Sequence, residues 1–505
     1  MRQYISKERE NKFIQKIQEY ANKTTANGKP KNNDLVSGIS SITLAGLQDF
    51  WTDAIEDTPI DSPQWCEIWL KTKDVDDVQN VMQRFRVATE NLRIQCKHDI
   101  FLSFPERIVT LAKVNSLSFA RLLDVNSDIA ECRRAREASV FFTEQTRLEQ
   151  KRWSDALSSN VHYAENPVAS VAILDTGVNN GHPLLQRVLH DEDMHTVDRA
   201  WGMHDAEGHG TGMAGIATYG DLSEALASVS PVNVPHCLES CKIMSGNFQT
   251  GDSQLYGFLT ANAITQIQDT APHRKRVVCM AVTDNSPLAE TGEPTSWSAA
   301  LDDLAAGVGG DGRQLILVSV GNIEDPEAYV KYPDSNFQAT VENPAQSWNS
   351  LSVGAFTEFV KTAYGEPIAP QGSLSPMSRT SVTWDSKWPT KPDVVFEGGN
   401  IARDPTGFCG TTEDLIPLTT SRDVPNRLFT TMSATSAATA QAAWFAAQLR
   451  TTYPTAWPET IRALIIHSAT WTEAMLMAFA PDGSKEQMAC LRRICGYCVP
   501  SLDRA

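Results

Sequence analysis

The rest of this chain is organised around one alanine-rich stretch, Thr431-Met432-Ser433-Ala434-Thr435-Ser436-Ala437-Ala438-Thr439-Ala440-Gln441-Ala442-Ala443-Trp444-Phe445-Ala446-Ala447. Alanine loses no side-chain entropy on entering a helix, so the run predicts a helix. Because the run has almost no polar face, we expect that helix to be buried. Ser436 lies near its beginning, where free backbone N–H groups and the positive end of the helix dipole converge. Such a serine is either an ordinary capping residue or a nucleophile whose oxyanion these N–H groups would stabilise.

The composition indicates a globular protein of two to four domains with a large core, since the chain has 505 residues of which 41% are hydrophobic. Its net charge of -17 disfavours nucleic acids and anionic membranes as partners. The N-terminus lacks the apolar segment of a signal peptide, and no 18-residue apolar run occurs. We therefore expect a cytoplasmic protein, whose ten cysteines are free thiols.

Two groups of cysteines have spacings that resemble those of zinc ligands: Cys490, Cys495 and Cys498, and the pair Cys237 and Cys241. A structural zinc site needs four ligands, and no matching pair follows either group. We expect neither a metal nor another cofactor.

The N-terminal third divides into a helix and linker at residues 1–40 and a small domain with its linker at residues 41–166. Within the second part, the patterns predict the order β-α-β-β-α-β, which is typical of a split βαβ sandwich. The expected elements are strands at 65–71, 92–96, 108–114 and 139–142, a helix capped by Asp74, and a helix at 116–123.

The remaining region, residues 167–505, alternates short apolar runs with helical stretches. The apolar runs are Val168–Leu174, Val277–Val282, Leu315–Val320 and Leu351–Ala355. Continuous apolar strands separated by helices predict an α/β fold whose parallel sheet is covered on both faces. In such folds the chemistry collects beyond the carboxyl ends of the strands.

Three polar residues follow these elements. Asp175 ends the first strand in Asp-Thr-Gly, a tripeptide that aspartic proteases also use, although those enzymes need two copies and only one occurs here. His209 lies between glycines before an apolar helix, and Asn322 follows another strand in a Gly-Asn turn. Each residue has a structural explanation as well as a catalytic one.

Taken together, these motifs resemble the subtilisin-like serine proteases (subtilases) over about residues 168–500. The resemblance rests on Asp175-Thr176-Gly177, His209-Gly210-Thr211, Gly321-Asn322, Lys391-Pro392-Asp393-Val394-Val395 and Thr435-Ser436-Ala437. It implies a subtilisin-like parallel sheet, Ser436 as nucleophile, His209 as general base and Asp175 as the residue that orients His209. It also implies an oxyanion hole at Asn322 and substrate contacts at Ala281, Val282, Thr283 and Gly321.

The sequence departs from the family pattern at both motifs. Gly212 replaces a second histidine, and Ala434, Ala437 and Ala440 replace Gly, Met and Pro. Ala434 is the most consequential departure, since a left-handed turn at this position would be strained. The catalytic side chains are intact and favour an active serine endopeptidase, with an inactive scaffold that binds peptides or a partner as the alternative.

By resemblance, residues 60–142 are similar to a subtilase propeptide, which implies autoinhibition of a protease that acts on proteins or peptides. The resemblance also raises the hypothesis of an AAA-type ATPase partner in bacterial antiviral defence. Gly307–Gly312 satisfies a dinucleotide-binding pattern but follows a helix, so we interpret it as a loop. The end of the chain looks like the opening of another helix, which suggests a longer natural C-terminus.

Overall fold

The computed structural model describes residues 7–25, 27–37, 46–52, 58–61, 63–73, 77–104, 106–134, 138–228, 231–245, 255–310 and 312–505. Two compact units make up the chain, Met1–Ala135 and Arg136–Ala505. The sequence patterns had placed this division near residue 166. The two units are described separately below.

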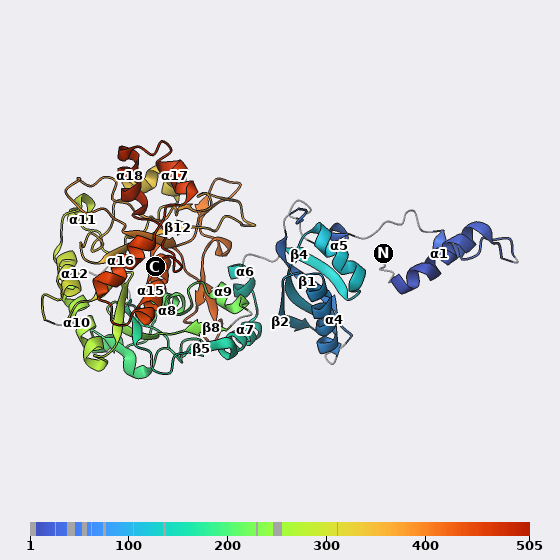
Figure 1. The fold of residues 1–505 in the computed structure, drawn as a ribbon, viewed down its shortest axis with the longest axis horizontal. Helices are drawn as coiled ribbons and strands as arrows, with labels where there is room; N and C mark the ends of the chain where they lie inside the picture. The colour runs from blue at the N-terminus through green and yellow to red at the C-terminus, as the bar shows by residue number, and fades with distance from the viewer. Residues whose placement is uncertain are drawn as a thin grey trace. The chain divides into compact units, whose positions relative to one another are not determined.

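The first unit contains an antiparallel sheet with strand order β2-β3-β1-β4 (Figure 1). Two of the unit's helices, α4 and α5, alternate with these strands in the predicted chain order β-α-β-β-α-β. The elements are α1 (Lys7–Asn22), α2 (Asn33–Val36), α3 (Leu47–Phe50), β1 (Gln64–Lys71), α4 (Val78–Asn91), β2 (Cys96–Phe104), β3 (Arg107–Val114), α5 (Ser116–Val125) and β4 (Ile129–Arg134). Apolar residues of the sheet and of both helices share one core, with Ile68, Phe85 and Phe119 at 0% exposure. The predicted capping role of Asp74 lies outside the described residues.

The last strand of this unit is not the predicted one. β4 pairs with β1 through residues such as Cys132, opposite Ile68, and Ile129, opposite Leu70. Its charged residues Glu131 and Arg133 hid it from the hydrophobic pattern. Ser139–Phe142, predicted as the strand, lies instead in a helix of the second unit.

The second unit is built on an eight-stranded sheet with the order β14-β12-β11-β10-β6-β9-β7, in which β15 also pairs with β12. Only the β12–β14 pairing is antiparallel. The strands are β6 (Ala169–Asp175), β7 (Met194–Thr196), β9 (Cys237–Lys242), β10 (Lys275–Met280), β11 (Leu315–Ser319), β12 (Leu351–Thr357), β14 (Ser373–Leu374) and β15 (Val394–Glu397). The predicted α/β class and the four predicted strands are therefore confirmed.

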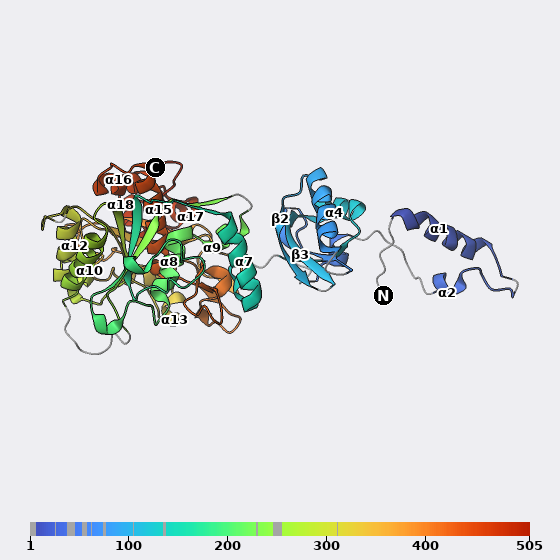
Figure 2. The same ribbon diagram turned by 90° about the horizontal axis from the view of Figure 1, so that it is seen from below.

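Helices cover both faces of this sheet. On one face, α10 (Tyr256–Thr270) and α12 (Ser296–Ala306) share a core with alternate residues of the strands, such as Val278 and Val318. The intervening residues face α15 (Ala434–Thr452), and Cys279 Sγ lies 3.7 Å from the Thr439 carbonyl oxygen. Figures 1 and 2 both show α10 and α12 side by side, away from α15 and α8 (His209–Tyr219). The continuous apolar strands are explained by this burial on both faces.

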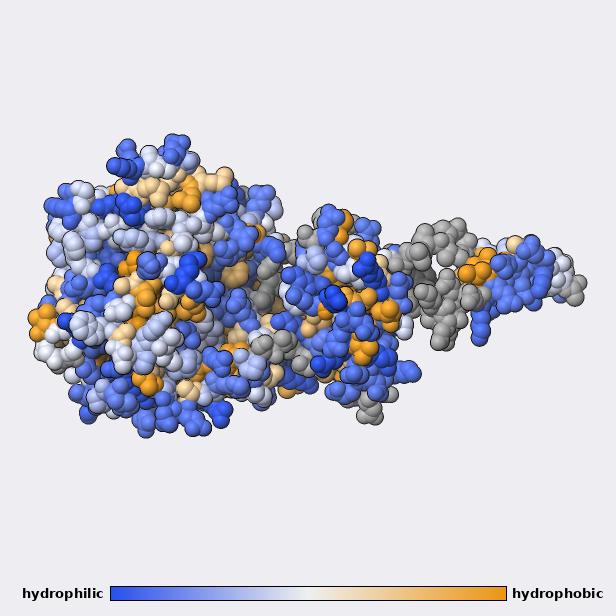
Figure 3. Space-filling view, in the orientation of Figure 1, coloured by the Kyte–Doolittle hydropathy of each residue, from blue (hydrophilic) through white to orange (hydrophobic). Residues whose placement is uncertain are grey.

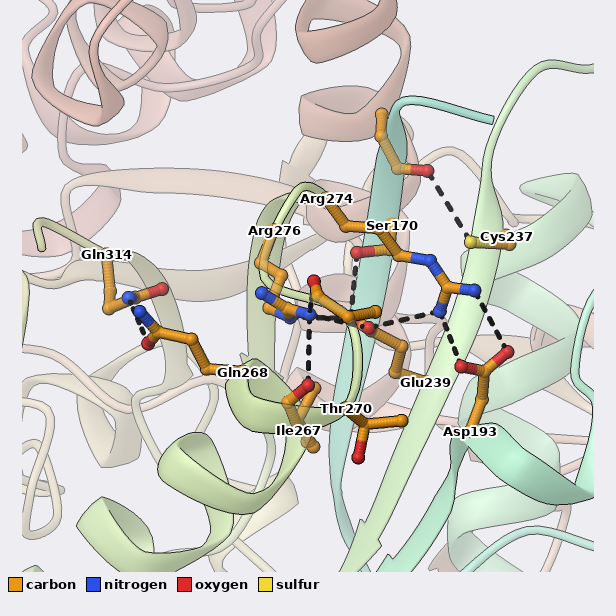
Figure 4. Close-up of polar contacts among 12 residues, drawn as sticks. Ser170, Asp193, Cys237, Glu239, Ile267, Gln268, Thr270, Arg274, Arg276 and Gln314 are labelled. Carbon is orange, nitrogen blue, oxygen red and sulfur yellow. Dashed lines mark hydrogen bonds and ion pairs between the residues drawn. The ribbon is translucent and has the colours of Figure 1, made fainter. Parts of the chain in front are cut away.

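A buried ion network joins the amino end of the sheet, opposite the edge where Asp175 ends β6 (Figure 4). Glu239, 1% exposed, accepts two hydrogen bonds of 2.9 Å from the Arg276 guanidinium. It also accepts one of 3.1 Å from Arg274, which pairs with Asp193 at 2.6 Å. Ser170 donates its hydroxyl to the same carboxylate at 2.8 Å. Each charge in the network is paired, and the contacts link β6, β9 and β10.

The segment before β6 belongs to the second unit. It forms α6 (Ala138–Thr143) and α7 (Arg147–Asn160), which are followed by β5 (Val161–Tyr163). Ser139 donates its hydroxyl to the Ile416 carbonyl oxygen at 2.8 Å. This contact spans the second unit from its beginning to its final third.

Aromatic packing explains why this segment folds as helices on the second unit. Phe142 is buried between Trp153, whose ring centroid is 5.1 Å away, and Phe429 of β19 (Phe429–Thr431), at 6.0 Å. The side chain of Gln150 donates to the Phe142 carbonyl oxygen and accepts from Leu428 N at 2.7 Å. The segment that follows the propeptide-like unit is therefore helical and packs beside β19.

On the face seen in Figure 3, hydrophobic residues lie scattered among polar ones. Among the described residues, no helix is both long enough and apolar enough to cross a membrane.

Candidate active site

The carboxyl edge of the sheet brings three predicted residues together, beginning with Asp175. This residue is the last of β6 and is fully buried. Its Oδ1 accepts hydrogen bonds from Thr176 N at 2.8 Å and from His209 Nδ1 at 2.8 Å. Its Oδ2 is also buried and has no hydrogen-bond partner among the described residues. The carboxylate is thus fixed by its own strand end and directed at the imidazole.

His209 is the first residue of α8, and a second buried carboxylate, Asp205, organises the loop before it. Asp205 Oδ1 accepts from Glu207 N, Gly208 N and Thr176 Oγ1, at 2.8–3.0 Å. Its Oδ2 accepts from Thr211 N at 2.9 Å and from Thr211 Oγ1 at 2.7 Å. Asp205 therefore holds the chain on both sides of His209.

Ser436 completes the chain of hydrogen bonds from α15. Its Oγ lies 3.0 Å from His209 Nε2, so the imidazole bridges Asp175 and Ser436. Ser436 is 5% exposed and is surrounded by buried alanines of the same helix. As the third residue of α15, it carries one of the backbone N–H groups that have no intrahelical acceptor.

The charges around His209 favour its protonated form. Burial lowers the pKa of His209, but the carboxylates of Asp175, Asp205 and Glu207 raise it, and the net result is a pKa above the ordinary value of 6.5. The nearest of these carboxylates is Asp175, which is hydrogen-bonded to the ring. The site is therefore built to stabilise an imidazolium that forms next to Ser436.

Asn322 lies three residues beyond the end of β11 (Leu315–Ser319), next to the start of α15. Its Oδ1 accepts from Thr435 N at 3.0 Å and from Thr435 Oγ1 at 2.6 Å. Because a backbone N–H can only donate, the amide oxygen must face Thr435 and the NH₂ group must face away. The backbone of Asn322 is held as well, since Arg379 Nε donates to its carbonyl oxygen at 2.9 Å.

Of the residues predicted to contact substrate, Thr283 lines a cavity together with Asn322, and Gly321 directly precedes Asn322. Ala281 and Thr283 are half-buried and follow the last ladder residue of β10, Met280, whereas the Val282 side chain belongs to the apolar core. Gly321 is buried with a φ of 91°, and a Cβ at this position would lie 2.2 Å from Glu342 Oε2. Glycine is therefore required at residue 321.

The structure explains one departure from the family pattern and locates the cost of another. At Gly212, an added Cβ would lie 3.2 Å from Met432 Sδ and 3.4 Å from Thr419 Cγ2, so these side chains fill the space of a larger residue. Ala434 has a φ of 64°, the left-handed conformation in which an alanine is strained. Its N–H donates to the Gly398 carbonyl oxygen at 2.7 Å, which helps to hold this turn.

Asp205, Arg379 and Glu342 were not predicted from the sequence. Asp205 had a weak signal, a carboxylate four residues before His209 in a Gly-containing loop. Arg379 and Glu342 had none, because they reach the Asn322 turn from segments 57 and 20 residues further along the chain.

Three other interpretations of the sequence concern a dinucleotide site, an aspartic protease and a metal site. Gly307 forms the left-handed C-cap of α12, in agreement with a loop rather than a dinucleotide site. The parallel sheet differs from the paired all-β lobes that an aspartic protease requires. Among the described residues, no group of three or more His, Cys, Asp or Glu side chains is arranged to hold a metal ion.

Comparison with known proteins gives a matching family model and several similar proteins. The curated "Uncharacterized protein y4bN" of Sinorhizobium fredii is 28% identical over 255 residues, which are 46% of this chain and 56% of y4bN. The chain therefore spans little more than half the length of this relative. A Staphylococcus aureus structure, the epidermin leader peptide processing serine protease EpiP, is 13% identical with a TM-score of 0.42, and the match covers 87% of this chain and 97% of EpiP.

A lanthipeptide protease structure is 15% identical with a TM-score of 0.43, and the match covers 72% of this chain and 92% of that protein. The model of the subtilase family, Peptidase S8, matches residues 168–497. Because this match covers more than half of the 505 residues and lies over the sheet, α8 and α15, the chain belongs to the subtilase family.

Proposed function

We propose that this protein is a serine endopeptidase that hydrolyses peptide bonds of protein or peptide substrates. The observation that carries the proposal is the hydrogen-bonded chain Asp175–His209–Ser436, with contacts of 2.8 and 3.0 Å. A serine hydroxyl needs a base in order to attack a carbonyl, and the imidazole needs a carboxylate that fixes its tautomer. Membership of the subtilase family supports the same chemistry.

In the proposed reaction, Ser436 Oγ forms a bond to the carbonyl carbon of the substrate while His209 Nε2 accepts the hydroxyl proton. The oxyanion receives hydrogen bonds from Asn322 Nδ2 and Ser436 N. The intermediate then collapses, the C–N bond breaks, and His209 gives its proton to the leaving amine. Water hydrolyses the acyl-enzyme by the same steps, with His209 again acting as base. The substrate backbone would lie along residues 281–283 and Gly321 as an added strand.

Covalent labelling by a fluorophosphonate tests this proposal directly, because the reagent reacts only with an activated serine. The wild-type protein should be labelled and should cleave peptides, and Ser436→Ala should do neither. Ser433→Ala is a matched control in the same segment, since the Ser433 side chain makes no capping hydrogen bond. A folded wild-type protein that is not labelled even after a cut between residues 134 and 138 has separated the two units would instead support the inactive scaffold.

We also propose that the first unit restrains this activity. The support is the β-α-β-β-α-β order of residues 64–134, which is similar to that of a subtilase propeptide. Since α6 and α7 belong to the second unit, a separating cut would have to fall between Arg134 and Ala138.

A further inference from the structure

A polar cavity of about 450 Å³ opens beside Asn322. Thr283 lines one side of it, and the Asn322 turn continues into the acidic residues Glu324 and Asp325. Glu342 and Arg379 complete the wall. The cavity thus lies between the segment proposed to hold the substrate backbone and the proposed oxyanion donor.

This position identifies the occupant, and the inference rests here on the proposed function. When Ser436 attacks, the carbonyl oxygen of the substrate lies at the Asn322 amide. The side chain of the same substrate residue begins at the carbon next to that carbonyl, so it must enter the hollow beside Asn322. The cavity is therefore expected to receive the residue on the amino side of the scissile bond.

The charges of the cavity do not cancel. Its only lining cation among the described residues, Arg379, already donates to Asn322 O at 2.9 Å, to Thr340 O at 3.1 Å and to Glu342 Oε1 at 2.8 Å. The cavity is also lined by three carboxylates, those of Glu324, Asp325 and Glu342. Glu324 forms no ion pair within the described part of the chain. The net lining charge is therefore negative, with Glu324 and Asp325 exposed at the rim.

Glu342 is the fixed element of this wall. Its side chain is 12% exposed and its Oε2 accepts from Thr283 Oγ1 at 2.6 Å. Its carboxylate lies against Gly321, where even a Cβ would collide with it. Burial raises the pKa of Glu342 and Arg379 opposes this effect, while Glu324 and Asp284 raise the pKa further. Glu324 and Glu342 therefore repel one another, and Arg379 pairs with Glu342 but not with Glu324.

We propose that this cavity binds a lysine or arginine side chain of the substrate residue whose carbonyl Ser436 attacks. A cationic head would make charge-assisted hydrogen bonds to the rim carboxylates while its aliphatic stem passes Thr283 and Ile323. An uncharged isostere would lose these charge-assisted hydrogen bonds and leave the negative charge of the lining uncompensated.

Binding of 4-aminobenzamidine to the full-length Ser436→Ala protein, followed by fluorescence, tests the cavity without catalysis. The amidine should bind at least tenfold more tightly than the neutral 4-aminobenzamide. The double variant Glu324→Gln/Asp325→Asn should lower this affinity at least fivefold, and Asn at residue 325 can still cap the helix that follows. Glu327→Gln is the matched control, an exposed carboxylate nearby that does not line the cavity. Equal binding of the two probes, or no effect of the double variant, would overturn the proposal.

Cleavage of two peptides that differ only in arginine or citrulline before the scissile bond separates this inference from the proposed function. A preference for arginine of at least tenfold that the double variant loses supports both. Cleavage without such a preference, or a preference for citrulline, overturns the inference and leaves the peptidase intact. If no peptide is cleaved in a Ser436-dependent manner, the proposed function fails, and the amidine titration still decides the charge preference of the cavity.

Discussion

Replacement of Asn322 by Ala and by Asp separates its proposed catalytic role from its structural one. Asn322→Ala removes the Nδ2 donor, which should lower kcat by about a hundredfold or more, or about 3 kcal/mol of activation free energy, a value measured on a subtilisin. It also removes the acceptor of Thr435 N and Oγ1, and Thr435 is fully buried. Leaving such donors unpaired should cost about 1–3 kcal/mol of unfolding free energy.

Asn322→Asp keeps the acceptor for Thr435 but places a second oxygen where Nδ2 donated. It should therefore preserve the stability of the second unit better than Asn322→Ala, and yet lower kcat at least as far, because a carboxylate repels the oxyanion. In both variants KM should change little. Thr435→Val is a useful intermediate, since it removes one of the two donors that orient the amide and should lower kcat only modestly.

The assay is steady-state hydrolysis of a fluorogenic peptide, with thermal unfolding of each variant measured in the same buffer. Fluorophosphonate labelling of Ser436 reports whether the nucleophile is still activated. If kcat is unchanged in both variants, Asn322 has only the role of a turn residue. If kcat falls in Asn322→Ala but not in Asn322→Asp, the loss comes from disturbed packing at Thr435 and the oxyanion argument is wrong.

Three further outcomes are expected. Because carboxylates raise the pKa of His209 above 6.5, its neutral, active form is lost as the pH falls, and kcat/KM should decline below about pH 7; an optimum near pH 4 would contradict His209 as the base. Asp205→Asn should move this acidic limb to lower pH and lower kcat about tenfold or more through misplacement of His209, whereas an unmoved limb would leave Asp205 a purely structural role. A sequence-specific protease site inserted between Arg134 and Ala138 should raise peptidase activity on cleavage, and an uncleaved protein that is already fully active would refute autoinhibition.

Elements and site residues could be predicted from the sequence where their signal was local, within a short stretch of the chain. The strands of the second unit are continuous apolar runs, and the four side chains named by resemblance lie together because each follows a strand or begins a helix. The Ser139–Phe142 prediction was wrong because four apolar or small residues fit a strand and a helix equally, and the choice depends on Phe429, far along the chain. Ion pairs such as Arg379–Glu342 depend on three-dimensional proximity alone.

Some expectations are not decided by the fold. A cytoplasmic location, an AAA-type ATPase partner and a role in antiviral defence stay predictions.

The left-handed Ala434 places a strain of about 1–2 kcal/mol immediately before Thr435 and Ser436. That strain is compatible with an active site, where unusual backbone conformations are often found.

The contacts of α6 and α7 have a consequence for the order in which the protein folds during synthesis. Ser139 and Gln150 bond to residues 277 and 278 positions later in the chain. At about 5–20 residues per second, the ribosome needs roughly 15–55 s to make those partners. Until then the Phe142 ring lacks its contact with Phe429, and closure over such a separation is intrinsically slow. The sheet of residues 64–134 has all its strands within its own segment, so we expect it to be complete before the second unit can begin to close.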